Sequence, residues 1–169
     1  MAGKLQVELR QTRPFALIEE EAMLNVVRTA EVIQALMADF LKDFELSPVQ
    51  YNVLRILRGA GGPGATCSQI GERLLNRDPD ITRLLDRMET RGLILRERSG
   101  TDRRVVLTRL SDAGLALVGR IDQPLRAMTK STLNKFGRDG LAELIAGLER
   151  MREALEAENT EANQERKSK

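Results

Sequence analysis

A cluster of arginines is the part of this sequence whose chemistry is easiest to interpret. The cluster consists of Arg96, Arg98, Arg103 and Arg104, with Gly100 and Asp102 between them. A guanidinium group presents a planar fork of N–H donors, which matches phosphate oxygens and the edge of guanine. Apolar residues flank the cluster at alternate positions, as a half-buried β-ribbon requires: Leu93, Leu95, Val105 and Leu107. The spacing predicts a charged β-hairpin with these apolar residues facing inward, and DNA is the expected partner.

The segment before the hairpin is predicted to be a helix from Pro79 to Arg91. Its apolar residues recur at helical spacing and comprise Ile81, Leu84, Leu85 and Met88. Asp78 fits the N-cap, Pro79 the first helical position, and Gly92 the position after the helix. With the apolar face buried, the outward face carries Asp80, Thr82, Arg83, Asp86, Arg87 and Thr90.

This outward face can lie in a DNA groove, where the first half of such a helix reaches base edges. We therefore predict that Asp80, Thr82 and Arg83 read bases and that Arg87 contacts a phosphate. The alternative is a surface helix tied by ion pairs three residues apart, such as Asp80 with Arg83.

The charge distribution favours the same partner. The 169 residues carry a net charge of +2, yet residues 68–110 hold ten basic and seven acidic side chains. All ten basic residues there are arginine, which favours forked recognition, although a solvated face would have the same composition. The chain has no histidine and one cysteine, so metal sites, internal disulfides and most catalytic constellations are not expected. We expect no cofactor and no enzymatic activity.

The residues before this segment predict further helices. Residues 1–13 are polar without a clear period and are expected to be a flexible arm. Apolar residues from Phe15 to Phe44 form a stripe too broad for one neighbour, which indicates a helix that also contacts a second subunit. Ser47-Pro48 begins the next helix, and the glycine-rich residues 59–64 break the pattern.

A short strand and a short helix are predicted next. Ala65-Thr66-Cys67 is a minimal strand, and Thr66 with Gln69 fits a capping box that begins a helix. The inward residues of this helix are expected to be Ile70, Leu74 and Leu75.

Two helices are predicted after the hairpin. Ser111 caps a long helix that is expected to bend near Pro124, and a last helix spans residues 141–155. Residues 158–169 are polar and charged, and we expect a frayed tail. The chain lacks a secretory signal and any apolar run long enough to cross a bilayer, which predicts a cytoplasmic protein.

The order helix, short strand, helix, helix, strand, loop and strand, with flanking helices, resembles the MarR (multiple antibiotic resistance regulator) family. The resemblance covers residues 46–114. It rests on residues 46–54, residues 82–94 and the family pattern D-x-R-x5-L-[T/S]-x-x-G, met by Asp102, Arg104, Leu110, Ser111 and Gly114. Asp78-Pro79-Asp80 departs from the family, in which small hydroxyl or basic residues are usual at this point.

The resemblance implies a mostly α, winged helix-turn-helix protein. Its segments would be a flexible arm (1–13), an N-terminal dimerisation helix (14–46), the winged helix-turn-helix domain (47–109), C-terminal dimerisation helices (110–157) and a flexible tail (158–169). The implied function is a ligand-responsive repressor that binds a pseudo-palindromic operator in double-stranded DNA as a homodimer. The implied ligand is small, apolar or aromatic, and lies in the cleft between the helical region and the winged helix.

The resemblance also assigns roles at the hairpin tip. Arg104 would enter the minor groove, whose narrow A·T-rich stretches attract arginine, and Asp102 would orient the tip. The complete set of predicted DNA-binding residues is Arg77, Asp80, Thr82, Arg83, Arg87, Asp102, Arg103 and Arg104.

Three alternatives compete with this interpretation. A winged helix can serve as a protein-interaction module, which would not bind DNA in a salt-dependent manner. Cys67 could act as a thiol-based redox sensor, although a small buried hydrophobe is the simpler interpretation. A hydrolase built on Cys67 is disfavoured because no histidine is present to activate the thiol.

Overall fold

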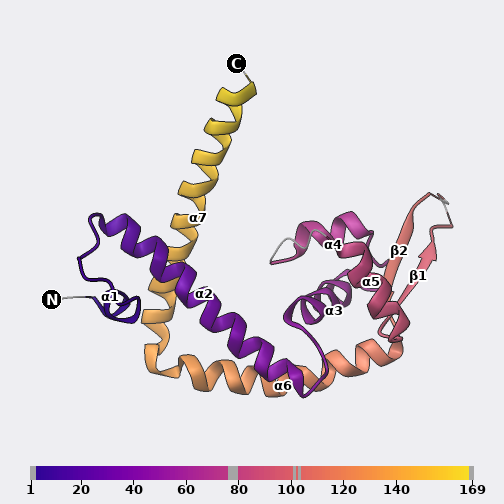
Figure 1. Ribbon diagram of the computed structural model, residues 1–169. Coiled ribbons are helices and arrows are strands. Elements are labelled where there is room, and N and C mark those ends of the chain that lie inside the picture. The colour runs from indigo at the N-terminus through magenta and orange to yellow at the C-terminus, as the bar shows by residue number, and fades with distance from the viewer. Residues whose placement is uncertain (1–2, 76–79, 101, 103, 168–169) are drawn as a thin grey trace. The chain divides into compact units, whose positions relative to one another are not determined.

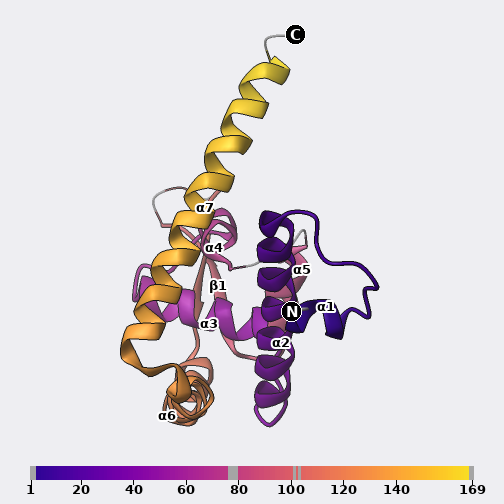
Figure 2. The same ribbon diagram turned by 90° about the vertical axis from the view of Figure 1, so that its left-hand side faces the viewer.

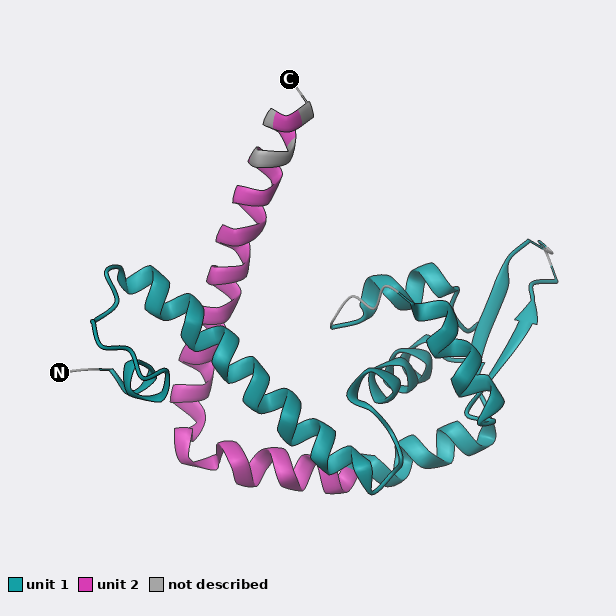
Figure 3. Cartoon of the chain, viewed as in Figure 1, with its two compact units in different colours: residues 1–122 teal, residues 123–169 magenta. Residues whose placement is uncertain are grey.

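The computed structural model describes residues 3–75, 80–100, 102 and 104–167. The chain forms two compact units, residues 1–122 and residues 123–169 (Figure 3). Unit 1 contains α1 (Lys4–Glu8), α2 (Ile18–Lys42), α3 (Pro48–Ala60), α4 (Cys67–Arg73), α5 (Ile81–Thr90), β1 (Ile94–Arg98), β2 (Val106–Leu110) and the first part of α6 (Asp112–Leu133) (Figure 1). Unit 2 contains the end of α6, a 3-10 turn (Asn134–Phe136) and α7 (Gly137–Lys167). This is the predicted mostly α architecture with a two-stranded wing.

The predicted helix starts at Ser47 and Thr66 are confirmed. The Ser47 hydroxyl accepts a hydrogen bond from the Gln50 backbone N–H at 3.3 Å, and the Gln50 side chain accepts one from the Ser47 N–H at 2.9 Å. Thr66 and Gln69 form the same reciprocal pair at 3.2 and 2.9 Å. Each reciprocal pair is a capping box, which satisfies backbone N–H donors that the start of a helix leaves without partners. These short polar motifs therefore fix where α3 and α4 begin.

Two local predictions near α4 are wrong. Cys67 is the first residue of α4, and the expected strand is reduced to one bridge in which Ala65 exchanges hydrogen bonds of 2.9 and 2.8 Å with Thr108. Leu75 is 84% exposed, because α4 ends at Arg73 and the helical spacing no longer places Leu75 inward. The glycine-rich break also starts later than expected, since α3 continues through Gly59 to Ala60.

The core of unit 1 lies where α3, α4, α5 and the base of the wing meet. Its fully buried side chains include Val53, Leu54, Leu57, Ile70, Leu84, Leu85, Met88 and Ile94. The predicted apolar face of α5 is confirmed for Leu84, Leu85 and Met88, and Ile81 at the helix start is half-buried. The opposite face of α5 is therefore held outward.

The inward face of β1 differs from the prediction by one residue. The antiparallel strands pair Ile94 with Leu110 and Arg96 with Thr108, and both Ile94 and Thr108 are buried. Leu95, expected inside, is 51% exposed. The alternation was counted from Leu93, which is buried as predicted but lies in the turn between α5 and β1, where its N–H donates to the Met88 carbonyl at 3.0 Å. A one-residue shift moves every side chain to the other face of a ribbon.

Gly92 and Ser111 join the end of α5 to the start of α6. Gly92 has φ +69° and donates to the Glu89 carbonyl at 2.8 Å, so α5 ends in a left-handed glycine as predicted. The Ser111 hydroxyl accepts from the Gly114 N–H at 3.0 Å and donates to the Gly92 carbonyl at 2.6 Å. Ser111 therefore caps α6 as predicted and ties it to the turn before β1.

The two chain ends contain more helix than predicted. Residues 4–8 of the expected arm form α1 beside α2 (Figure 2), where Leu5 is only 4% exposed and Glu8 pairs with Arg28 at 3.4 Å. A single buried leucine is enough to dock such a short helix but leaves no period in the sequence. At the other end α7 continues to Lys167, since glutamate, alanine, glutamine and arginine are good helix formers. Pro124 lies inside α6, and a bend there stays a prediction.

No helix within the described ranges is both long and apolar enough to cross a membrane.

Candidate nucleic-acid interface

Helix α5 presents the predicted reading residues on its exposed face. Thr82, Arg83 and Arg87 are all exposed, and the Arg83 side chain is 82% exposed. They lie opposite the buried residues of α5 because helical spacing separates the two faces. The structure therefore places these three side chains where a partner molecule can reach them.

Asp80 is the N-cap residue of α5, one position before the helix begins at Ile81. The helix was expected to begin at Pro79 with Asp78 as its cap, and both residues lie outside the described residues. The Asp80 carboxylate is 3.3 Å from Arg83 Nε, which is the ion pair expected of an ordinary surface helix. This pair leaves Arg83 largely exposed, so a phosphate or base edge can compete for its other donors.

The wing tip is organised by Asp102. Its carboxylate accepts a hydrogen bond from the Arg104 N–H at 2.9 Å, and its carbonyl accepts one from the Val105 N–H at 3.0 Å. Ser99 N–H donates to the Val105 carbonyl at 2.8 Å, which continues the ladder toward the tip. Arg104 is exposed on this turn. Arg77 and Arg103 complete the predicted set, and both lie outside the described residues.

Arg96 is a residue whose placement the sequence analysis missed. It was counted among the arginines near the loop, but it lies at the base of the wing with a side chain only 22% exposed. Its guanidinium forms ion pairs with Asp86 and Glu89 on α5. The correct strand register would have been the signal, because it places Arg96 on the same face as Ile94.

A bidentate ion pair connects α3 to α6. Arg58 Nη1 and Nη2 donate to the two carboxylate oxygens of Asp122 at 2.7 and 3.1 Å, and both side chains are about one-third exposed. The hydrogen bond to Asp122 raises the pKa of Arg58 above its usual value. Paired fork geometry of this kind is the stronger form of ion pair, so it fixes α3 against α6 within unit 1.

Tyr51 on α3 provides a pH-dependent test of the packing within unit 1. Its side chain is buried, and burial raises its pKa; the nearby Arg55 offsets this only in part. As pH rises through about 10, the Tyr51 phenol ionises first in the unfolded chain. The stability that neutral Tyr51 contributes is therefore present below pH 10. It is lost as pH rises through the raised pKa of the folded state.

We expect the phenolate absorbance of the folded protein to titrate above pH 10. The protein has one tyrosine and no tryptophan, so this signal reports Tyr51 alone. Tyr51→Phe should lose the corresponding part of the alkaline fall in the free energy of unfolding. A phenolate midpoint at or below that of the denatured chain would contradict the burial of this ring.

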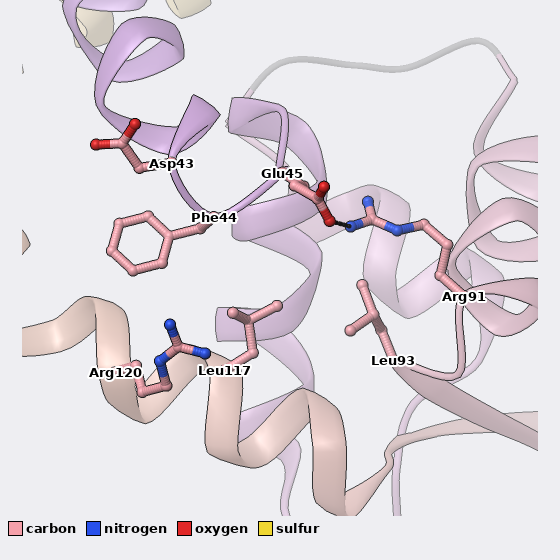
Figure 4. A pocket seen from close by; sticks show the side chains of 7 residues that line it. All are labelled: Asp43, Phe44, Glu45, Arg91, Leu93, Leu117 and Arg120. Atoms are coloured by element: carbon pink, nitrogen blue, oxygen red, sulfur yellow. Dashed lines mark ion pairs between the residues drawn. The ribbon is translucent and has the colours of Figure 1, made fainter.

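A cavity of about 490 Å³ lies beside the end of α5 (Figure 4). Its lining combines three apolar side chains with two acids and two arginines: Phe44, Leu93, Leu117, Asp43, Glu45, Arg91 and Arg120. Arg91 is the C-cap residue of α5, and its guanidinium is 4.0 Å from the Glu45 carboxylate across the cavity. The cavity lies wholly within unit 1, beside the end of α5, the helix that carries Arg83.

Cys67 is half-buried, whereas a small buried hydrophobe was predicted. Its Sγ lies 4.0 Å from the Thr82 hydroxyl oxygen, so it packs between α4 and α5. Within the described part of the chain, no three cysteine or acidic side chains are grouped as metal ligands would be.

Comparison with known proteins gives a consistent result. The model of the MarR family matches residues 44–105. A MarR transcription factor from Planctomyces limnophilus is 41% identical, with a TM-score of 0.61 over 80% of this chain and 98% of that one. The chain belongs to the MarR family. The regulator PecS of Dickeya dadantii (strain 3937) is 28% identical over 148 residues, which are 86% of this chain and 89% of PecS.

A protein whose structure was solved in complex with DNA shares the fold. It is MepR of S. aureus, which is 20% identical with a TM-score of 0.67 over 77% of this chain and 93% of MepR. The match to the family model and the similarity to the MarR transcription factor and to PecS show that the chain is a winged helix-turn-helix transcriptional regulator of the MarR family, as expected from the sequence.

Proposed function

We propose that this MarR-family protein is a repressor that binds a pseudo-palindromic operator as a homodimer, with α5 in the major groove and the wing in the minor groove. The observation that carries the proposal is the exposed face of α5, where Thr82, Arg83 and Arg87 stand opposite a fully buried apolar face. The existence of a MepR–DNA complex supports DNA as the partner. A protein with this role acts where the chromosome is, in the cytoplasm.

Exposed apolar residues on the long helices support the homodimer. On α2 they are Ile18, Met23, Val26, Val27, Val32, Ile33 and Leu36, and on α7 they are Leu144, Ile145 and Leu155. Helices that expose this many large apolar side chains gain free energy by burying them against another chain. A second copy of the same protein would supply the two-fold symmetry that a pseudo-palindromic operator requires.

The cavity beside Arg91 supports a ligand response. Phe44, Leu93 and Leu117 can hold an apolar or aromatic body, while Arg91 and Arg120 can meet its polar groups. Because Arg91 caps α5, a ligand that competes with Glu45 for Arg91 would act on the end of the reading helix. We infer that ligand binding lowers DNA affinity, which is the response of a repressor that releases its promoter.

Selection from a randomised pool of DNA duplexes tests the proposed operator. We expect the full-length protein to enrich a sequence with two related half-sites about one helical turn, or 10 base pairs, apart. Inserting half a turn between the half-sites should nearly abolish binding, because the second subunit would face the wrong side of the duplex. No enrichment, or binding that tolerates the insertion, would overturn the proposal and favour a protein-interaction module.

Single substitutions should separate the roles of three arginines on the selected duplex. Arg83→Ala should cost about 1–3 kcal/mol of binding free energy and relax the preference at one position in each half-site. Arg104→Ala should weaken binding by a similar amount. This loss should be larger on duplexes with more A·T base pairs beside the half-sites. Arg87→Ala should weaken selected and random duplexes alike. Dissociation constants on duplexes with single-base changes would show each pattern or its absence.

A further inference from the structure

Arg96 bridges the two elements proposed to contact DNA. It lies on β1 at the base of the wing, directly opposite the buried Thr108, with its side chain 22% exposed. From there its Nη1 atom reaches the Asp86 carboxylate and lies 3.7 Å from Glu89 Oε2. Asp86 and Glu89 are three residues apart on α5, so one guanidinium holds two carboxylates on the same helix face.

The other ion pair described within the wing does not serve this purpose. Arg109 pairs with Glu97 at 3.7 Å across the two strands, on the face opposite Arg96, so this pair stays within the ribbon. Arg98 and Arg104 are exposed nearer the tip. Among the described side chains of the wing, Arg96 is thus the cation that ties the ribbon to α5.

We propose that Arg96 is a positioning residue for DNA binding, which holds the wing against α5 through Asp86 and Glu89 so that Arg83 and Arg104 approach the duplex in a fixed relation. The inference rests on the proposed DNA-binding function. It adds a role for a residue that need not contact DNA at all.

Arg96 can fill this role for two physical reasons. A two-stranded ribbon is only marginally stable by itself, so the direction of the wing depends on contacts at its base. In addition, Asp86 lies on the same exposed side of α5 as Arg83 and Arg87, and an unpaired carboxylate there would repel DNA phosphates. Arg96 answers both needs, since it fixes the base of the wing and neutralises the acids beside the reading residues.

A purely structural ion pair predicts a different outcome. It would change the free energy of unfolding and the fraction of active protein, and affinities for all duplexes would fall together. A positioning role predicts that discrimination between duplexes falls, because the two contacts no longer fit the operator at once.

The test is the ratio of dissociation constants for a scrambled duplex and for the duplex selected by the full-length protein. Circular dichroism first verifies that the parent and Arg96→Gln are both folded. Arg96→Gln should then lower this ratio by about fivefold to thirtyfold. Arg96→Lys should recover most of it, because an ammonium keeps a positive charge opposite both carboxylates. The matched control is Arg109→Gln, which removes the same charge from the other face of the ribbon and should weaken both duplexes together.

A double-mutant cycle identifies the partners of Arg96. The variant Asp86→Ala/Glu89→Ala removes both carboxylates, keeps strong helix formers on α5, and should also lower the ratio. Adding Arg96→Gln to that variant should lower the ratio no further. This variant also answers the question if Arg96→Gln alone does not fold.

The outcomes are distinct. An unchanged ratio in folded Arg96→Gln or in Asp86→Ala/Glu89→Ala would overturn the inference. An equal effect of Arg96→Gln in the parent and in Asp86→Ala/Glu89→Ala would also overturn it, because Arg96 would then act on DNA directly. A parent protein that does not distinguish the two duplexes would instead refute the proposed function.

Discussion

Gly114→Ala is expected to lower the free energy of unfolding by about 3 kcal/mol or more, at the upper end of the cost of overpacking. A Cβ atom at residue 114 would lie 2.1 Å from the Leu93 carbonyl oxygen and 3.1 Å from its carbonyl carbon. These are backbone atoms, and the Leu93 carbonyl also accepts a hydrogen bond from Ser111 at 3.2 Å. Neither side can retreat without breaking the junction of α5, β1 and α6.

Gly119→Ala is the matched control in the same helix. A Cβ atom at residue 119 would meet nothing within 4 Å, and alanine favours helix over glycine by about 0.5–1 kcal/mol. Urea denaturation followed by circular dichroism should therefore show a large loss for Gly114→Ala and a small gain for Gly119→Ala. Equal stabilities for the two variants would mean that α6 does not approach Leu93 this closely.

A chain that ends at Gly137 is expected to lose its dimer. This truncation removes α7 with its exposed Leu144, Ile145 and Leu155, which we propose to lie in the dimer interface. A monomer engages one half-site instead of two, so affinity for the selected duplex should fall about a hundredfold or more. Unit 1 keeps its own buried core, and the helical signal of α3, α4 and α5 should remain.

Light scattering measures the loss of the dimer, and fluorescence anisotropy measures the loss of affinity. The control is a chain that ends at Ala157, which retains all three of these apolar residues and should remain dimeric. A stable, folded dimer from the chain that ends at Gly137 would show that α7 is not required for assembly.

Features determined by local chemistry were predictable from the sequence. Ser47 and Thr66 cap their helices through residues three positions away, and Gly92 ends α5 through its own backbone freedom. The buried face of α5 follows from helical spacing, so the exposure of Arg83 and Arg87 followed with it. Gly114 was recognised only through the family pattern, and the structure supplies its physical reason, the close approach to Leu93.

Features that depend on how elements meet were not predictable. The predicted inward face of β1 was wrong because the alternation was counted from Leu93, which lies in the turn between α5 and β1. The same error hid the bridge from Arg96 to Asp86 and Glu89, since a one-residue shift places Arg96 on the wrong face. The cavity beside Arg91 gathers residues from the loop after α2, from the turn after α5 and from α6, which no spacing in the sequence connects.

The most direct test of the central claim, that α5 and the wing read DNA, is fluorescence anisotropy over a salt series. The parent and the triple variant Arg83→Ala/Arg87→Ala/Arg104→Ala would each be titrated onto the selected and the scrambled duplex. The account predicts that the parent prefers the selected duplex, weakens steeply with salt, and loses both the preference and much of the salt slope in the triple variant. A triple variant that binds both duplexes as the parent does would contradict it.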